Sequence, residues 1–548
     1  MKKFIYTSVI VALSLTSCSE DYLDRVPLDA IVDETFWENE DQLILAVNAI
    51  YGNIKAKNTV DFENIGDNTL WPSTTAYLQI GSGNFNHDLA TLNNEWRNMY
   101  AGIRQCNNFL ENYEQAFVAV PERREILAAE VRVIRAYLYS YLSELFGDVP
   151  LVTTVLDIDE LYGGRDPKEQ VVEFVLTELQ EAADILPAEI PSGNDLGRIR
   201  KGAALGLKAR VALYNGFYDV AEVASQEVMN LGLYELYSNG DPSTSYNDLF
   251  TYSGRQARGN NRETMIARLH LEEINRHNLS REIQVPDQNA RFNPTKSLVD
   301  SYLCIDGLPI DRSPLYSEES YEAIFENRDP RMSQTILAPG SPWGGRFDGN
   351  PDNDDPSVYT APKFRSDRRG SVTVTGYYFT KYVEPSTVHQ VTQDVNDIHV
   401  LRYAEVLLTY AEAKLELGSL TQSDLDISIN LLRERVGMRP MVISELQANQ
   451  LDLREEIRRE RRVELALEGQ RYFDIKRWRQ GDLLAEDTKG VRRDLVLAQD
   501  EVANVQVDSD GYVVALTNRR FEDPKNYLWP VPLVQLERNP VLGQNPGW

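Results

Sequence analysis

The sequence LRYAEVLLTYAEAKLELGSLTQSDLDISINLLRERVG, residues 401–437, carries the strongest structural signal in the chain. Its apolar residues recur at intervals of three and four, the spacing of one face of an α-helix. Gly418 is expected to end a first helix, Ser423 to cap a second, and Gly437 to end that one. The two apolar stripes are Leu401, Ala404, Leu408, Ala411 and Leu415, then Leu425, Ile429, Leu432 and Val436.

Residues 201–231 repeat this plan far away in the sequence. Asn215 and Gly216 form the predicted turn between two further stripes. Such pairs, with alanines that allow close approach of the helices, resemble tetratricopeptide units of ~34 residues. The stripes are Ala204, Leu207, Val211 and Tyr214, then Val220, Ala224, Val228 and Leu231. Helical spacing also predicts helices over about 41–55, 96–110, 121–146 and 168–186, so the expected fold is mainly α.

One more helix is predicted over residues 454 to about 478, and it is crowded with arginine and glutamate. Glu455 and Arg459 have the favourable i,i+4 spacing for an ion pair. A charge run on a helix is usually a solvated face, so we expect this one to be exposed rather than to bind a ligand.

The rest of the chain lacks a sustained period. Residues 58–88 and about 235–398 are rich in turn-forming residues, and alternation predicts short strands at 371–375 and 513–516. We therefore expect a single domain over 41–548. It has a helical scaffold at about 41–234 and 399–480, a long irregular loop-and-short-strand insertion at about 235–398, and an irregular tail at 481–548.

The N-terminal residues have the pattern of a targeting signal. Lys2 and Lys3 precede an apolar run at 4–15 that is too short to span a bilayer of ~30 Å. This pattern is typical of a secretory signal. Leu15-Thr16-Ser17-Cys18 looks like a bacterial lipobox, which predicts a signal peptide at 1–17, lipidation of Cys18 and a lipidated tether at 18–40. An ordinary cleaved signal is the alternative, but the small residues before Cys18 favour lipidation.

The net charge of −28 makes nucleic-acid binding improbable, because such a surface repels phosphate backbones. No later stretch is apolar enough for a transmembrane helix. Besides Cys18 the chain has two cysteines, Cys106 and Cys304. Two interpretations of them stay open, a single disulfide or two separate buried thiols.

Motifs for catalysis are missing from the sequence. There is no P-loop, no nucleophile elbow and no His-Glu-x-x-His zinc motif. His270 and His277 would lie two helix turns apart, too far for one ion on one helix face. A carboxylate pair for glycoside hydrolysis depends on a spatial separation that sequence does not reveal. We therefore predict that the protein is not an enzyme and requires no cofactor.

Residues 348–355 resemble a calcium loop. Asp348, Asn350, Asp352 and Asp354 place oxygen ligands at alternate positions, as a hard cation requires. Position twelve is Tyr359 instead of glutamate, so the loop is not an EF-hand. A solvated acidic loop is favoured, and a structural calcium site is the alternative.

Loop aromatics are the candidate ligand-binding residues. An exposed aromatic ring can stack on a sugar ring while polar neighbours bond its hydroxyl groups. The alternative is that each ring only holds its own loop against the scaffold. The candidates are Trp71, Asn68 and Tyr77 in the first loop and Trp343, Arg346 and Tyr359 in the insertion.

Taken in order, several segments make the chain resemble the SusD/RagB family of nutrient-binding lipoproteins. They begin with the lipobox at Cys18 and end with Gln544-Asn545-Pro546-Gly547-Trp548. The segments between are residues 129–137, 146–151, 197–204, 328–331, 401–408, 411–413, 458–465, 469–474 and 528–532.

The resemblance implies an α-superhelical fold in which tetratricopeptide-like pairs cradle an irregular ligand-binding half, without catalysis. It also implies a lipid-anchored protein on the exterior of the outer membrane. There it would act as a lid on a SusC-like TonB-dependent transporter barrel and deliver oligosaccharides to it. Trp71 and Trp343 fall in loops where related proteins place binding aromatics. A peptide-binding member of the family, or a surface glycosidase, is the alternative, and the sequence does not specify which glycan is bound.

Overall fold

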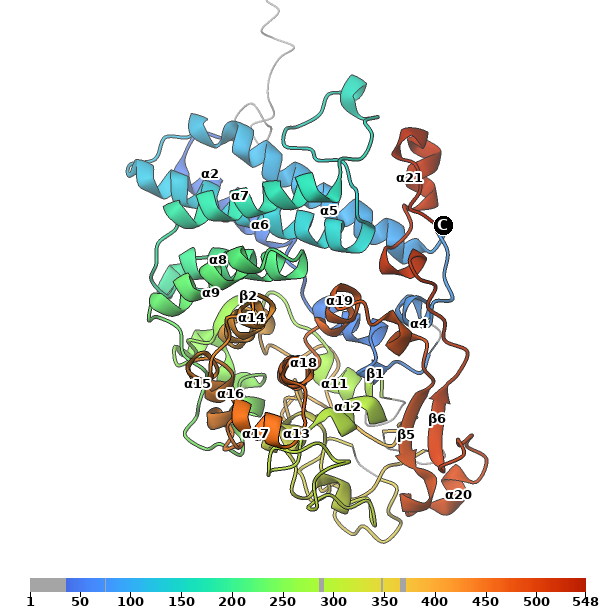
Figure 1. The fold of residues 1–548 in the computed structure, drawn as a ribbon. Helices are drawn as coiled ribbons and strands as arrows, with labels where there is room; N and C mark the ends of the chain where they lie inside the picture. The colour runs from blue at the N-terminus through green and yellow to red at the C-terminus, as the bar shows by residue number, and fades with distance from the viewer. Residues whose placement is uncertain (1–35, 74, 285–289, 346–347, 365–370) are drawn as a thin grey trace, which may run out of the picture.

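A stack of long helices forms the upper half of the molecule (Figure 1). The computed structural model describes residues 36–73, 75–284, 290–345, 348–364 and 371–548. The predicted signal peptide, Cys18, most of the tether and Arg346 lie outside the described residues. The stack contains α2 (Glu40–Tyr51), α5 (Ala90–Asn112), α6 (Pro121–Phe146), α7 (Lys168–Ile185), α8 (Lys201–Tyr214) and α9 (Tyr218–Asn230).

Local sequence sets the ends of these helices. Asn39 caps α2 and forms a reciprocal capping box with Gln42. Pro121 occupies the first turn of α6, where its missing N–H costs nothing. Gly147 ends α6 with a φ of 75°, a conformation that favours glycine.

The predicted helix pair at 201–231 is confirmed as α8 and α9, and the first helix of the 401–437 pair joins the same continuous stack. Helices α6, α7, α8 and α9 contact one another in sequence order, and α14 (Tyr403–Glu416) packs next against α9. The second predicted helix of the 401–437 pair is instead two short helices, α15 (Gln422–Asp426) and α16 (Ile429–Arg435). Its cap is Thr421 rather than Ser423, because Thr421 and Asp424 form a capping box.

The predicted charged helix is also two helices, α18 (Leu453–Glu464) and α19 (Arg471–Arg477). The turn between them contains Leu467 and Gly469 at positive φ values of 65° and 73°. A Cβ atom at Gly469 would lie 2.1 Å from the carbonyl oxygen of Thr59, so the turn passes too close to that loop for any side chain.

The prediction that this charged face is solvated is wrong. The Glu464 carboxylate is fully buried and pairs with three guanidinium groups, those of Arg331, Arg402 and Arg435, at 3.0, 2.8 and 2.6 Å. Helix α18 contacts α14 on one side and the short helices α12 (Lys296–Ser301) and α13 (Pro330–Thr335) on the other. Arg331 comes from the insertion, whereas Arg402 and Arg435 come from the second scaffold segment, so both parts of the chain supply the partners that allow these charges to be buried.

Three two-stranded antiparallel pairs organise the lower half. They are β1 (Thr69–Leu70) with β3 (Asn293–Pro294), β2 (Thr264–Arg268) with β4 (Ile398–Arg402), and β5 (Thr488–Arg492) with β6 (Tyr512–Leu516). Strand β6 confirms the prediction at 513–516. Residues 371–375 are not a strand, because the Thr373 hydroxyl accepts hydrogen bonds from the backbone amides of Thr375 and Gly376 and bends the chain there.

The remaining short helices of the described residues lie mostly in the irregular segments. They are α3 (Asn58–Asp61), α4 (Ala76–Gly81), α10 (Ser245–Asp248), α11 (Leu279–Ile283), α17 (Ile443–Ala448), α20 (Gln499–Val502) and α21 (Leu533–Arg538).

Two principal hydrophobic cores result, one in the helical stack and one in the insertion. The second is dominated by tyrosine, including Tyr246, Tyr302, Tyr321 and Tyr378. Cys106 and Cys304 are separate, buried free thiols, which settles the two interpretations in favour of no disulfide. The mainly α fold predicted from helical spacing is confirmed.

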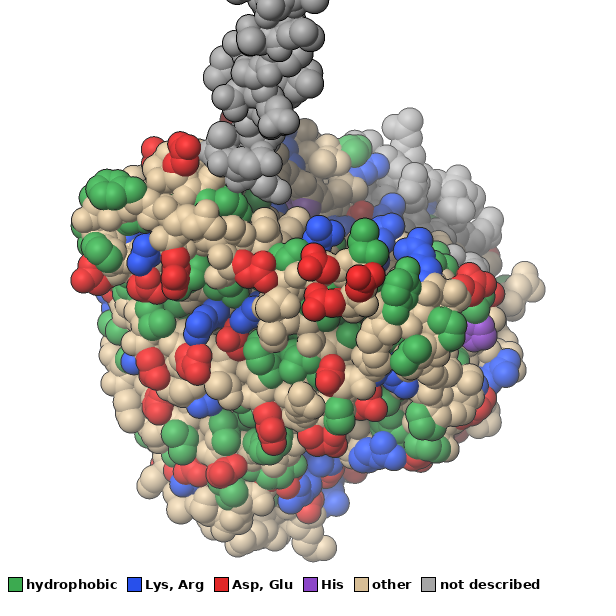
Figure 2. All heavy atoms as spheres, turned by 90° about the horizontal axis from the view of Figure 1, so that it is seen from above, with side chains coloured by type: hydrophobic (Ala, Val, Ile, Leu, Met, Phe, Trp, Pro, Cys, Tyr) green, Lys and Arg blue, Asp and Glu red, His purple; other side chains and the backbone are tan. Residues whose placement is uncertain are grey.

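Over the described ranges, no helix is both long and apolar enough to cross a membrane. Seen from above the helical stack, acidic and basic side chains are interspersed over the surface (Figure 2).

Candidate functional site

Trp71 lies directly after β1 and remains partly exposed. The pairing of β1 with β3 sets Leu70 opposite Asn293, which brings Trp71 beside the residues before β3. Its ring centroid lies 6.0 Å from that of Phe292, and the guanidinium of Arg291 lies 5.3 Å from the Trp71 ring centroid. The indole is thus supported on one side by a buried phenyl ring and flanked by a cation.

A row of alternating charges extends from this tryptophan. Arg291 pairs with Glu282 at 2.5 Å, Glu282 with Lys57 at 2.7 Å, and Lys57 with Asp61 at 2.8 Å. Burial alone would lower the pKa of Lys57, but the two carboxylates raise it above its ordinary value. Trp71 and these four residues are called the Trp71 site below. Glu282 and Asp61 are buried and hold the two cations in place, whereas the Arg291 side chain is 40% exposed. The site thus sets a partly exposed guanidinium beside an aromatic ring, a combination that can contact a sugar ring and its hydroxyl groups.

The other first-loop candidates lie deeper. Tyr77 is partly buried and packs on Phe62, with ring centroids 5.9 Å apart. Asn68 is buried, its amide donates to Glu63 at 2.6 Å, and its oxygen accepts from Arg462 at 2.8 Å. Because both ends of that amide are engaged, Asn68 holds the loop and does not face a ligand in this structure.

The insertion aromatics are core residues, contrary to their expected place on an exposed surface. Trp343 is 7% exposed and Tyr359 fully buried, with ring centroids 5.3 Å apart. The Tyr359 hydroxyl lies 2.6 Å from that of Tyr321. The Trp343 backbone amide donates to the Ser357 carbonyl oxygen, so the loop folds back on itself and turns both rings inward. The structure therefore does not bring them together with Trp71.

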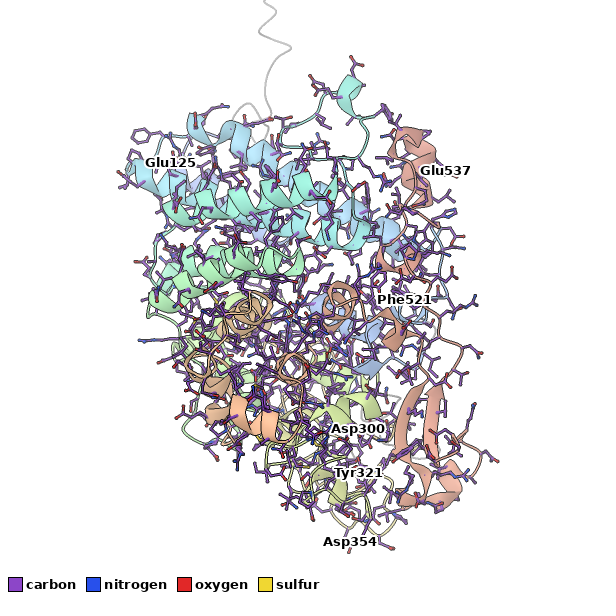
Figure 3. The ribbon with its side chains drawn as sticks, viewed as in Figure 1. Glu125, Asp300, Tyr321, Asp354, Phe521 and Glu537 are labelled. Atoms are coloured by element: carbon purple, nitrogen blue, oxygen red, sulfur yellow. The ribbon has the colours of Figure 1, made fainter. Side chains whose placement is uncertain are left out.

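The acidic loop is held by its own hydrogen bonds. One carboxylate oxygen of Asp348 accepts from the backbone and the hydroxyl of Thr360 at 2.6 and 2.7 Å, and Asn350 accepts from the Asp352 amide. Asp354 lies at the lower end of the molecule (Figure 3). No group of three His, Cys, Asp or Glu side chains is placed to hold a metal ion in the part of the chain that is described. Calcium binding here stays a prediction.

The predicted separation of His270 and His277 assumed that both lie on one helix, but neither residue is helical. A bridge between Leu271 and Asn275 folds the chain back, and the two imidazole rings lie 4.6 Å apart in the interior. Burial lowers the pKa of His270 to about 3 and also lowers the pKa of His277, although Asp394 acts against the shift of His277.

A polar cleft of about 820 Å³ lies on the other side of the β1–β3 pair. At the cleft, the Asp67 carboxylate pairs with the guanidinium groups of Arg471 at 2.7 Å and Arg462 at 3.1 Å. Asp300, in the lower half of Figure 3, is on the cleft wall contributed by α12. Sequence reasoning missed this cleft because it assigned the arginines of α18 to solvent. Arg459 and Arg462, three residues apart on one helix face, were the signal that could have found it.

Comparison with known proteins gives matches over nearly the whole chain. Residues 258–548 match a family model described as the SusD family, and residues 21–213 match one described as starch-binding associating with outer membrane. A SusD-like protein of Formosa agariphila is 23% identical over 577 residues, covering 100% of both chains. A SusD-like protein of Bacteroides ovatus is 23% identical over 594 residues, covering 100% of this chain and 98% of its own.

Solved structures of SusD-like proteins have a similar fold. The crystal structure of a SusD-like carbohydrate-binding protein from Bacteroides fragilis has a TM-score of 0.79 and 27% identity, covering 93% of this chain and 100% of its own. A laminarin-binding SusD-like protein shares the fold with a TM-score of 0.66 at 21% identity, covering 93% of this chain and 100% of its own.

Proposed function

This chain belongs to the SusD family, a family of carbohydrate-binding proteins, and on that premise we propose that it captures oligosaccharides at the cell surface through the Trp71 site. The observation that carries the proposal is the partly exposed Trp71 ring with the Arg291 guanidinium 5.3 Å from its centroid. An aromatic ring beside a partly exposed guanidinium can stack on a sugar ring and donate hydrogen bonds to its hydroxyl groups.

The proposal extends to location and partner. Lipidation at Cys18 would anchor the protein to the outer membrane, because diacylation with N-acylation supplies more than one lipid chain. From there it would hand the oligosaccharide to a SusC-like TonB-dependent transporter, without turnover. Co-purification with a large barrel protein in mild detergent would support this partner, and recovery as a lone monomer would count against it.

The test of the binding function is native affinity electrophoresis of lipid-free protein (residues 19–548) against plant, fungal and host polysaccharides. We expect one polysaccharide class to retard the protein, and Trp71→Ala to weaken its affinity for that polysaccharide ~5-fold, since an aromatic stacking contact contributes about 1 kcal/mol. Tyr162→Ala is the matched control, because Tyr162 is an aromatic residue with 60% exposure outside the Trp71 site.

Three other results of this experiment would favour a different site or a different function. Retardation that Trp71→Ala leaves unchanged would remove the Trp71 site from the proposal. Binding of peptides without any retardation by polysaccharide would favour the peptide-binding alternative. Release of reducing sugar during incubation would identify a glycosidase instead.

A further inference from the structure

A cavity of about 320 Å³ lies between the end of α6, the start of α7, α19 and the C-terminal tail. Five cations and one carboxylate line it, which is the reverse of the balance expected in a chain of net charge −28. These are Lys168, Lys476, Arg477, Arg479 and Lys525, with Glu144 as the carboxylate.

Lys476 has no ion-pair partner among the residues that the structure describes. It is 7% exposed, and its ammonium donates to the backbone oxygen of Glu144 at 2.6 Å. Among the described residues, no carboxylate oxygen lies within 4.0 Å of it, whereas the other four cations each have one. Those pairs are Lys168–Glu144, Arg477–Glu412, Arg479–Asp523 and Lys525–Glu522, at 3.1, 2.6, 3.1 and 3.4 Å.

A buried ammonium without an anion is costly, because burial penalises the charged form. Burial lowers the pKa of Lys476 to about 7, with Lys168 acting in the same direction and Glu144 against it. An anionic group that entered the cavity would supply the missing counter-charge and favour the protonated lysine.

The walls indicate what carries that anion. The cavity is larger than an inorganic anion needs, and Pro524 and Pro546 line it together with Tyr214 and Tyr527. The Arg479 guanidinium covers the Tyr527 ring at 3.6 Å from its centroid. We propose that this cavity binds a sugar acid of pyranose size, with its carboxylate at Lys476 and its ring against Pro524 and Pro546. It shares no residue with the Trp71 site and is a second, separate binding site.

The experiment is isothermal titration calorimetry of lipid-free protein with D-galacturonate, D-galactose and inorganic phosphate at pH 6 and pH 8. We expect saturable binding of galacturonate at pH 6 and roughly tenfold weaker binding at pH 8, because the Lys476 ammonium loses its proton while the ligand stays ionised. Lys476→Met should abolish the binding. Lys208→Met is the matched control, because that lysine is partly buried and bonds only Gln180 among the described residues.

Lys476→Arg separates charge from fold. This variant stays protonated at both pH values, so it should bind galacturonate with little difference between pH 6 and pH 8, even if Lys476→Met does not fold. Trp71→Ala should leave galacturonate binding unchanged, which keeps this site distinct from the proposed glycan function. The proposal is overturned if galacturonate does not bind or binds equally to Lys476→Met. Equal affinity for phosphate would overturn the sugar-acid assignment, and equal affinity for galactose the role of the carboxylate.

Discussion

Trp71 and Trp343 are both loop tryptophans, but their surroundings differ. The Trp71 ring has Phe292 on one side and remains partly exposed. Trp343 is enclosed by Tyr359 and Tyr378, with centroids 5.3 and 5.6 Å away, and its indole N–H has no partner among the described residues. The first ring is available to a ligand, while the second fills core volume.

We predict that Trp343→Ala lowers the free energy of unfolding by about 3–5 kcal/mol, the usual cost of emptying an aromatic site in a core. Trp71→Ala should cost less than Trp343→Ala, because the Trp71 ring is only partly buried. Urea denaturation followed by circular dichroism measures both. A stable, folded Trp343→Ala protein that has lost polysaccharide binding would instead return Trp343 to the binding surface.

At the scale of the element, helix α18 carries an exposed glutamate on one face and buried glutamates on the other. Glu455 is 53% exposed and pairs only with Arg458, at 3.2 Å. Glu464, on the buried face, meets Arg331, Arg402 and Arg435. Burial would raise the pKa of Glu464, but these three arginines hold it well below its ordinary value, so the carboxylate stays ionised.

We predict that Glu464→Gln destabilises the protein by about 3–5 kcal/mol, because it leaves three buried guanidinium groups short of one negative charge. Glu455→Gln, the matched control on the same helix, should cost less than about 0.5 kcal/mol, as is usual for an exposed pair. Chemical denaturation of both variants at pH 7 makes the comparison. Equal stability of the two would show that the Glu464 pairs are dispensable.

At the scale of the whole molecule, the β2–β4 pair connects the helical stack to the insertion through a buried histidine. His399 lies in β4, donates to the Leu249 carbonyl oxygen at 3.2 Å and accepts from the Thr264 hydroxyl at 3.1 Å. Burial lowers its pKa to about 4 from the ordinary 6.5. The folded protein therefore binds fewer protons than the unfolded chain between these pH values, so stability is present above pH 6.5 and lost as pH falls towards 4.

The corresponding prediction is a difference in pH dependence. Between pH 6.5 and 4 the wild type should lose about 3 kcal/mol more than His399→Gln. Asp397, whose pKa burial raises to about 6, acts in the opposite direction in both proteins and so cancels from the comparison. Parallel curves for wild type and His399→Gln from urea melts at several pH values would contradict the prediction.

The sequence by itself determined the helical stack. Helix formation depends on signals that act within a few turns, so a sequence reveals them directly. Such signals are the apolar stripes of residues 201–231 and 401–436, Pro121 in a first turn and Gly147 at a helix end. The same is true of strand β6, whose alternation is local.

Only the tertiary structure decided which charges and aromatics are buried. In the sequence, Glu464 cannot be distinguished from a solvated glutamate, and its burial depends on Arg331 and Arg402 from other segments of the chain. Trp343 likewise cannot be distinguished from Trp71 in the sequence, and its burial depends on Tyr359 and Tyr378. Desolvation depends on every group that packs around a side chain, and most of those groups are remote in sequence. For the same reason the cavity at Lys476, assembled from α6, α7, α19 and the tail, has no signature in any one stretch of the chain.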